Sequence, residues 1–276
     1  MDTSTIYVGK AENVLKTFPA SSVDLVITSP PYDQLRSYHE TQWNFETFKL
    51  MAKEIYRVTK PGGYVVWVVN DQTKDGSESL TSFEHALYFK NECGFKVHDT
   101  MIYKKTGFSN PSSNRYHQVF EYMFVFVKGK WKTFNPIKDR VNKYAGQTRW
   151  GKNTKRQHDG SLKQDKDTPA YAETGMRFNV WEMSAGGNVS TSDKVAFKHP
   201  AIFPEKLAND HIISWTNEDD IVLDPMCGSG TTLKMAHLNN RQWIGIDCVE
   251  TYVDNIAAER LKLHNIEVNI DKTMVL

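Results

Sequence analysis

Apolar and polar positions follow two alternating periodicities along the chain, and these predict strands and helices in turn. The runs VDLVI, residues 23–27, and YVVWVV, residues 64–69, are almost continuously apolar, which is typical of strands buried on both faces of a parallel sheet. Between them, apolar residues recur at helical spacing from Phe45 to Tyr56, after Asn44 as a candidate helix cap. Weaker patterns predict strands at 6–8, 95–103, 119–127, 220–223 and 242–246, and helices at 9–15, 80–91, 204–215, 231–238 and 250–264.

This alternation predicts an α/β fold with a doubly wound, mostly parallel sheet of the seven-stranded type. The pattern dissolves between residues 128 and 198, where the chain is polar, basic and rich in Gly, Asn, Asp and Thr. That stretch is too long for an ordinary connection, so an inserted region is expected there. The expected organisation is one domain in two halves, residues 1–127 and 199–276, which flank the insertion at 128–198.

The positive charge of the chain is concentrated in this insertion. Residues 128–163 contain eleven Lys and Arg against two acids, a net charge of +9, which leaves −8 for the rest of a chain whose overall net charge is +1. A basic run alone is consistent with a solvated surface, but Trp131, Phe134, Tyr144 and Trp150 are interleaved with the cations. Cations with neighbouring aromatic rings favour contact with nucleic acid through phosphates and stacked bases. The candidate contacts are Arg140, Lys143, Arg149, Lys152, Lys155 and Arg156.

Cysteine usage and hydropathy exclude several classes of protein. The three cysteines, Cys93, Cys227 and Cys248, form no CxxC pair, so neither a disulfide framework nor a zinc site is expected, and no metal is predicted. No apolar run has the length of a membrane span, and the N-terminus does not resemble a signal peptide. These features predict a reduced, cytoplasmic protein with no membrane partner.

A glycine-rich loop follows the predicted strand at 220–223. The segment IVLDPMCGSGTT, residues 221–232, places two glycines between a strand and a helix, where the backbone can approach a ligand and free N–H groups face it. Asp247 ends the next strand and can accept hydrogen bonds from ribose hydroxyls. A plain strand–turn–helix corner is the alternative. Because neither GxGxxG nor GxxxxGK[ST] is present, S-adenosylmethionine fits better than a dinucleotide. The candidate cofactor residues are Asp224, Pro225, Cys227, Gly228, Ser229, Gly230, Thr231, Thr232 and Asp247.

A second unusual segment, Ser29-Pro30-Pro31-Tyr32, ends the buried strand at 23–27. The two prolines fix φ and remove two N–H donors, which leaves the Pro30 carbonyl free to accept a hydrogen bond outside the sheet. The Ser29 hydroxyl is a second acceptor, and Tyr32 offers a flat face beside both. Two acceptors and a stacking plane suit a planar ring that carries an amino group. The alternative is a rigid turn with a buried tyrosine.

Together, TSPPY and the downstream DPMCGSGTT resemble the amino-group DNA methyltransferases, with the motif order of the β subgroup. The resemblance implies a Rossmann-like S-adenosylmethionine-dependent fold in which the insertion is the target-recognition region. It implies that HPAIFP, residues 199–204, holds the methionine end of the cofactor through His199 and Phe203. It also implies that NRYHQVFEYMFVFVK, residues 114–128, closes over a flipped base. The chain departs from the family pattern at Gly9-Lys10, where many relatives have Gly-Asp.

The resemblance implies site-specific methylation of an exocyclic amino group in double-stranded DNA, with Ser29, Pro30, Pro31 and Tyr32 as the catalytic segment. Serine before Pro-Pro favours cytosine N4, and adenine N6 stays open. No Pro-Cys occurs, which argues against cytosine C5 chemistry. Asp33 and Asp71 are candidates to accept the released proton. An RNA methyltransferase and a non-catalytic DNA-binding module are alternatives, and a homodimer and a cognate restriction endonuclease are candidate partners.

Overall fold

The structure is a computed structural model that describes residues 1–32, 43–107, 113–147, 154–164, 170–184 and 189–274, without the side chains of Lys155 and Gln164. The chain divides into two compact units. The first comprises Met1–Asn135 and Asn179–Leu276, and the second comprises Pro136–Phe178.

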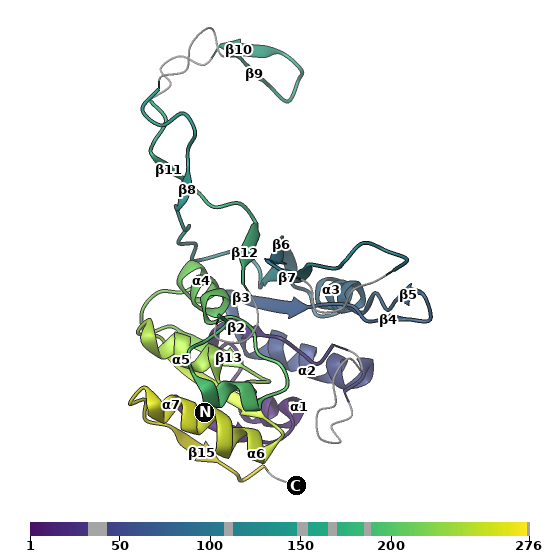
Figure 1. Ribbon diagram of the computed structural model, residues 1–276, viewed down its shortest axis with the longest axis vertical. Coiled ribbons are helices and arrows are strands. Elements are labelled where there is room, and N and C mark those ends of the chain that lie inside the picture. The colour runs from purple at the N-terminus through teal and green to yellow at the C-terminus, as the bar shows by residue number, and fades with distance from the viewer. Residues whose placement is uncertain (33–42, 108–112, 148–153, 165–169, 185–188, 275–276) are drawn as a thin grey trace. The chain divides into compact units, whose positions relative to one another are not determined.

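The first unit is built on a nine-stranded sheet with the order β12-β6-β7-β3-β2-β13-β14-β1-β15 (Figure 1). Every neighbouring pair is parallel except the two pairs made by β7, which runs antiparallel to β3 and to β6. The strands are β1 Thr5–Val8, β2 Val23–Thr28, β3 Thr59–Val69, β6 Lys96–Lys105, β7 Phe120–Val127, β12 Val180–Met183, β13 Ile221–Asp224, β14 Gln242–Asp247 and β15 Asn269–Asp271.

Helices cover both faces of this sheet, and alternate residues of β3 show the two layers. Val65 and Trp67 pack in a core with α1, α2 and α3, whereas Val66 and Val68 pack in a second core with α4, α5 and α7. Such two-sided burial explains the unbroken apolar runs of the central strands. The helices are α1 Ala11–Val14 with a 3-10 turn at Leu15–Thr17, α2 Phe45–Val58, α3 Thr81–Asn91, a 3-10 turn at Lys194–Lys198, α4 Glu205–Trp215, α5 Thr231–Leu238, α6 Glu250–Tyr252, a π-helical turn at Val253–Ala257 and α7 Ala258–Leu263. The predicted doubly wound, mostly parallel α/β fold is confirmed.

Two details of the central elements follow from local chemistry. Asn44 caps α2 as predicted, since its Oδ1 accepts a hydrogen bond from the Thr47 N–H at 3.0 Å. The chain then passes from α2 into β3 without a loop, so β3 begins at Thr59 rather than at the predicted Tyr64. Pro61 lacks the N–H that a central strand needs, and the β2–β3 pairing shifts register between Val23 and Leu25, opposite this start of β3.

The sheet also contains two short edge strands that the sequence pattern did not predict. β12 lies within the stretch expected to be irregular and pairs in parallel with β6, where it buries Trp181 and Met183. β15 pairs with β1 at the other edge. Both strands are short and include exposed residues, so they lack the continuous apolar run that marks the buried strands, and their pairing reveals them. A small hairpin, β4 Thr73–Lys74 with β5 Ser77–Glu78, precedes α3.

The second unit, Pro136–Phe178, consists of two short antiparallel pairs in its described part. β8 Arg140–Val141 pairs with β11 Thr174–Gly175, and β9 Thr154–Arg156 pairs with β10 Leu162–Gln164. None of the side chains described in this unit is buried. The unit is therefore held by backbone pairing and surface contacts rather than by a hydrophobic core.

This unit is narrower than the expected insertion at 128–198, and the flanks of that insertion belong to the first unit. On the N-terminal side, Phe134 stacks on Trp215 at a centroid distance of 5.2 Å, and the Asn135 N–H donates to the Ser214 carbonyl at 2.8 Å. On the C-terminal side, β12 joins the main sheet. Ring stacking with a backbone hydrogen bond attaches the N-terminal flank to the first unit, and sheet pairing attaches the C-terminal flank.

Candidate active site

The two motifs singled out from the sequence meet at the carboxyl ends of neighbouring parallel strands. β2 ends at Thr28, immediately before Ser29, and β13 ends at Asp224, at the start of the glycine loop. The Thr28 hydroxyl donates to Asp224 Oδ1 at 2.7 Å, and the Met226 N–H donates to the same oxygen at 3.1 Å. Carboxyl ends of strands at a change in strand order are where open α/β sheets bind ligands. A buried hydrogen bond therefore joins the two halves of the site.

The Ser29–Tyr32 segment turns away from the sheet at this edge. Its serine is half-buried and Pro30 is buried. The Ser29 Oγ lies 2.9 Å from the Tyr32 hydroxyl, and the Tyr32 ring packs against the core beneath α2 and α3. The Tyr32 hydroxyl also donates to Glu121 Oε2 at 2.8 Å, and Glu121 Oε1 forms an ion pair with Lys105 at 2.5 Å. A serine, a phenol and a paired carboxylate thus lie in one chain of contacts.

Glu121 is a site residue that the sequence analysis missed. It lies on β7, within the segment that the family resemblance assigned to closure over a base, and it contacts Tyr32 across 89 positions of sequence. A single acid within the apolar run VFEYMFVFV was the available signal, because an acid buried in a strand needs partners.

Asp71, a predicted proton acceptor, has a different local role. Its carboxylate accepts hydrogen bonds from the Ser82 N–H at 2.8 Å and the Ser82 hydroxyl at 2.6 Å, at the start of α3. It therefore caps that helix, where a carboxylate is favoured by the unpaired N–H groups. Asp33, the other candidate, lies outside the described residues.

The glycine loop approaches its neighbours closely enough to require glycine. Gly228 and Gly230 have φ values of +47° and +74°, in the left-handed region that disfavours a side chain. A Cβ at Gly228 would lie 2.8 Å from Nε2 of His199, whose ring also packs edge-on against Tyr252 at a centroid distance of 4.6 Å. His199 therefore lies beside the loop, and its contact with the methionine end of the cofactor stays a prediction. Phe203 packs instead against the core beneath α4, α5 and α7.

Asp247 lies at the end of β14, directly against this loop. Its Oδ2 accepts from the Gly228 N–H at 2.8 Å and its Oδ1 accepts from the Val249 N–H at 2.9 Å. A carboxylate offers about four lone-pair positions, so Asp247 keeps capacity for a further hydrogen bond. Burial raises the pKa of Asp247 to about 6, and burial likewise raises the pKa of Asp224 to about 6.

The remaining candidate cofactor residues belong to the loop and the first turn of α5. Pro225 and Thr232 are buried. Cys227 is also buried, and burial, followed by the nearby carboxylates of Asp247 and Asp224, raises the pKa of its thiol well above the ordinary value. A neutral buried thiol is a poor nucleophile, in line with the sequence argument against cytosine C5 chemistry.

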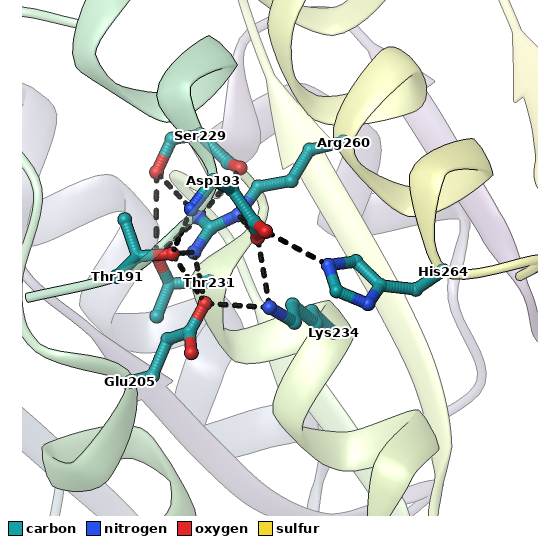
Figure 2. A network of polar contacts seen from close by, with 8 residues as sticks. All are labelled: Thr191, Asp193, Glu205, Ser229, Thr231, Lys234, Arg260 and His264. Carbon is teal, nitrogen blue, oxygen red and sulfur yellow. Dashed lines mark hydrogen bonds and ion pairs between the residues drawn. The ribbon is translucent and has the colours of Figure 1, made fainter. Parts of the chain in front are cut away.

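A buried polar network supports the loop from beneath (Figure 2). The Arg260 guanidinium, which is fully buried, donates to the Ser229 carbonyl at 3.1 Å and to the Thr231 hydroxyl at 2.8 Å. Its other nitrogens donate to Asp193 Oδ2 at 2.9 Å and to Glu205 Oε1 at 2.7 Å. The side chains of Ser229 and Thr231 therefore face Arg260, and their contact with a cofactor stays a prediction.

Lys234 and His264 extend this network. Lys234 contacts Asp193 at 2.8 Å and Glu205 at 2.7 Å, while His264 Nε2 lies 2.9 Å from Asp193 Oδ1. Burial alone would raise the pKa of Asp193, but hydrogen bonds from Lys234, Arg260 and His264 outweigh that effect and lower the pKa below its ordinary value. Asp193 is therefore a permanent carboxylate that holds the helices behind the loop.

These features fit an adenosine-type cofactor. The loop is narrow enough to exclude a Cβ at Gly228, α5 begins at the loop, and Asp247 offers buried acceptors at the end of the next strand. Gly9 follows β1 beside the same acid, since its N–H donates to the Asp247 carbonyl at 2.9 Å. Lys10, where the family pattern has an acid, is exposed.

The predicted DNA contacts fall in the second unit. The Arg140 guanidinium lies over the Phe178 ring at 4.7 Å and donates to the Met176 carbonyl at 3.0 Å, so it also supports the unit itself. Lys143 and Arg156 are exposed. Lys155 lies in β9, and Arg149 and Lys152 lie outside the described residues.

Neither a metal site nor a membrane span is found in the described part of the chain. No group of three or more His, Cys, Asp or Glu side chains there is placed to hold a metal ion. Among the same residues, no helix is long and apolar enough to cross a membrane.

Comparison with known proteins identifies the family. The model of the N6_N4_Mtase family, described as DNA methylase, matches residues 23–259. The orphan methyltransferase M.BamHII of Bacillus amyloliquefaciens is 55% identical over 241 residues, which cover 87% of this chain and 89% of that protein. The cytosine-N4-specific PvuII DNA methyltransferase shares the fold, with a TM-score of 0.65, 20% identity and coverage of 98% and 97%. TTHA0409 of Thermus thermophilus, solved with S-adenosyl-L-methionine, also shares it, with a TM-score of 0.62, 21% identity and 98% coverage of both chains. The chain belongs to the N6/N4 family of S-adenosylmethionine-dependent DNA methyltransferases.

Proposed function

We propose that this DNA methyltransferase methylates N4 of a cytosine that is flipped out of double-stranded DNA, and that Ser29, Pro30, Pro31 and Tyr32 form the catalytic segment. The observation that carries the proposal is the buried Thr28–Asp224 hydrogen bond, which sets this segment beside the glycine loop. Duplex DNA hides the exocyclic amino group among stacked bases, so the target base must leave the stack to reach the segment.

The catalytic segment binds the base by its shape and its hydrogen-bonding pattern. The ring stacks on Tyr32, and the amino group donates to the Ser29 hydroxyl and the Pro30 carbonyl. These bonds hold the amino nitrogen so that its lone pair is less delocalised into the ring. Positioning and charge placement supply most of the rate enhancement. A serine hydroxyl is too weakly basic to take the proton before methyl transfer.

The loop residues hold the cofactor on the other side of the Thr28–Asp224 bond. S-Adenosylmethionine supplies an electrophilic methyl group on a sulfonium. Gly228 and Gly230 allow close approach of the backbone, Asp247 accepts from the ribose hydroxyls, and His199 lines the loop. The proposed cofactor site also includes residues of the loop and of the first turn of α5, together with one phenylalanine from the preceding motif. These residues are Asp224, Pro225, Cys227, Ser229, Thr231, Thr232 and Phe203.

The second unit is proposed to bind the DNA backbone and to read its sequence, within the target-recognition region at 128–198. The charge of +9 across residues 128–163 and the exposure of Lys143 and Arg156 support this role. A double-stranded DNA substrate supports the expectation of a cytoplasmic enzyme. A homodimer and a cognate restriction endonuclease stay predictions.

The test is to incubate the protein with unmethylated duplex DNA and S-adenosylmethionine, digest the DNA to nucleosides and identify the product by mass spectrometry. N4-methylcytosine is expected, and Ser29→Ala should abolish most of it while Ser22→Ala, a serine outside the site, should not. N6-methyladenine would support the alternative base with the same site. Absence of any methylated nucleoside across DNA of varied sequence would overturn the proposal and favour an RNA substrate.

A further inference from the structure

The contacts between Ser29, Tyr32 and Glu121 have a defined direction. Tyr32 has one hydroxyl proton and donates it to Glu121 Oε2 at 2.8 Å. At its contact with Ser29, 2.9 Å away, the Tyr32 oxygen must therefore accept, and Ser29 must donate. The proton of Ser29 is thus directed toward Tyr32, and the lone pairs of Ser29 are left for the substrate.

Glu121 is set to keep this direction. Its side chain is 11% exposed on a central antiparallel strand, and Lys105 on the neighbouring strand pairs with its Oε1 at 2.5 Å. The Lys105 ammonium pairs with this carboxylate, and a carboxylate accepts hydrogen bonds and cannot donate one. Burial of an acid on an otherwise apolar strand is costly unless it is paired, and here the second oxygen is directed to the catalytic segment.

The direction matters for the choice of base. A cytosine or adenine presents an amino donor at the position where uracil or hypoxanthine presents a carbonyl acceptor. A site with two acceptors, Ser29 Oγ and the Pro30 carbonyl, pairs with the amino group and leaves a carbonyl without a donor. A serine hydroxyl free to rotate would donate to the carbonyl instead and would accept both kinds of base.

We propose that Glu121 is a positioning residue that, through Tyr32, holds the Ser29 hydroxyl as an obligatory acceptor and so makes the site select an amino-bearing base over its keto-bearing analogue. This inference rests on the proposed function, because it takes Ser29 as the group that receives the amino group. Sites that hydrogen-bond a substrate group reject analogues that leave a buried polar group unpaired, which is the general basis of such selection.

The test uses binding rather than methyl transfer. Once the methylated site has been mapped, two duplexes are made that differ only in cytosine or uracil at the target position, or adenine or hypoxanthine if the product is N6-methyladenine. Dissociation constants of cofactor-free wild type, Glu121→Gln and Tyr32→Phe are measured for both duplexes by fluorescence anisotropy. Any ease of flipping a mismatched base is common to all three proteins, so it cancels when their preferences are compared.

Wild type should prefer the amino-bearing duplex, and Glu121→Gln should reduce that preference by about tenfold. Tyr32→Phe keeps the stacking ring and should shift the preference in the same direction. Glu182→Gln is the matched control, because it also removes a carboxylate that pairs with a lysine. Glu182 lies on the edge strand β12, and its ion pair with Lys104 is exposed, with side chains 57% and 48% exposed. Its preference should equal that of wild type.

An unchanged preference in folded Glu121→Gln and Tyr32→Phe, with folding verified by thermal melting, would overturn the inference. An equal loss of preference in Glu182→Gln would also overturn it, because the effect would then be a general one of charge. Failure of the proposed function is distinguishable, since it would appear earlier as the absence of any methylated nucleoside with the wild-type protein. If Glu121→Gln does not fold, Tyr32→Phe decides alone.

Discussion

Replacement of Arg260 by methionine should remove the support of the cofactor loop. Arg260 is fully buried, and its guanidinium contacts two carboxylates as well as the Ser229 carbonyl and the Thr231 hydroxyl. Methionine matches the length of the aliphatic part of the side chain but donates no hydrogen bond. Lys234 would then be left as the cation shared by Asp193 and Glu205.

The magnitude follows from the cost of breaking a buried ion pair. Removing one partner of such a pair costs about 3 to 5 kcal/mol, and here two carboxylates would be left with the single ammonium of Lys234 between them. In a domain of this size, 1 kcal/mol shifts the midpoint of thermal unfolding by about 2 to 4 °C. We therefore expect Arg260→Met to lower Tm by about 6 to 20 °C.

The assay is thermal unfolding for Tm and urea unfolding for the free energy, both followed by tryptophan fluorescence, together with calorimetric titration of S-adenosylmethionine. Lys262→Met is the matched control: it lies on the same helix, is 62% exposed and pairs with Glu259 at 3.0 Å. Exposed pairs contribute about 0 to 1 kcal/mol, so the control should be nearly as stable as wild type. Cofactor affinity should fall in Arg260→Met and not in the control.

A loss of less than about 1 kcal/mol in the free energy of unfolding of Arg260→Met would refute this reasoning, because the buried network would then contribute no more than an exposed ion pair. An unchanged cofactor affinity in a destabilised Arg260→Met would separately refute the predicted effect on cofactor binding. The network would then stabilise the fold without shaping the loop.

Three further predictions concern the site and the second unit. Gly228→Ala should weaken binding of S-adenosylmethionine by at least about tenfold, because the new Cβ would lie 2.8 Å from His199 Nε2 at a φ of +47°. Calorimetric titration measures the affinity, and Gly129→Ala, at an exposed loop glycine, is the control. Cofactor binding should weaken as pH falls through about 6, because burial raises the pKa of Asp247 to about 6 and the protonated carboxyl loses acceptor capacity. Asp247→Asn should bind the cofactor weakly at every pH and flatten the pH profile. A wild-type affinity that is constant from pH 5 to 8 would contradict this prediction. Replacing Arg149, Lys152, Lys155 and Arg156 by glutamine should reduce the slope of log affinity for DNA against log salt by about 0.9 per lost phosphate contact, and an unaltered slope would remove them from the interface.

The central elements could be predicted from the sequence because their signals are local. Each signal is carried by residues that are near one another in the sequence, as in the apolar run of β2, the amphipathic spacing of α2 and the Asn44 cap. The direction of β7 could not be predicted, since an antiparallel strand between parallel ones has the same apolar pattern when both faces are buried.

The site shows the same limit. Ser29–Tyr32 and the glycine loop were found because each is a contiguous motif with its own chemistry. Glu121 was missed because its contact with Tyr32 spans 89 positions. The hydrogen bond between Asp71 and the start of a helix eleven residues later was likewise not predicted, and the role of Asp71 as a proton acceptor stays a prediction. Long-range pairing decides what a carboxylate does, and a single sequence does not contain it.

The absence of buried side chains among those described in Pro136–Phe178 has a consequence for how such enzymes diversify. Both ends of this unit leave from fixed points of the main sheet unit, where the Asn135 N–H donates to the Ser214 carbonyl at 2.8 Å and the Asn179 carbonyl accepts from the Ile102 N–H at 2.9 Å. A segment that contributes no core can be exchanged, lengthened or rewritten between two fixed attachment points without a packing penalty elsewhere. With the DNA-reading role proposed for this unit, the recognised sequence could change while the proposed catalytic segment and glycine loop are inherited intact.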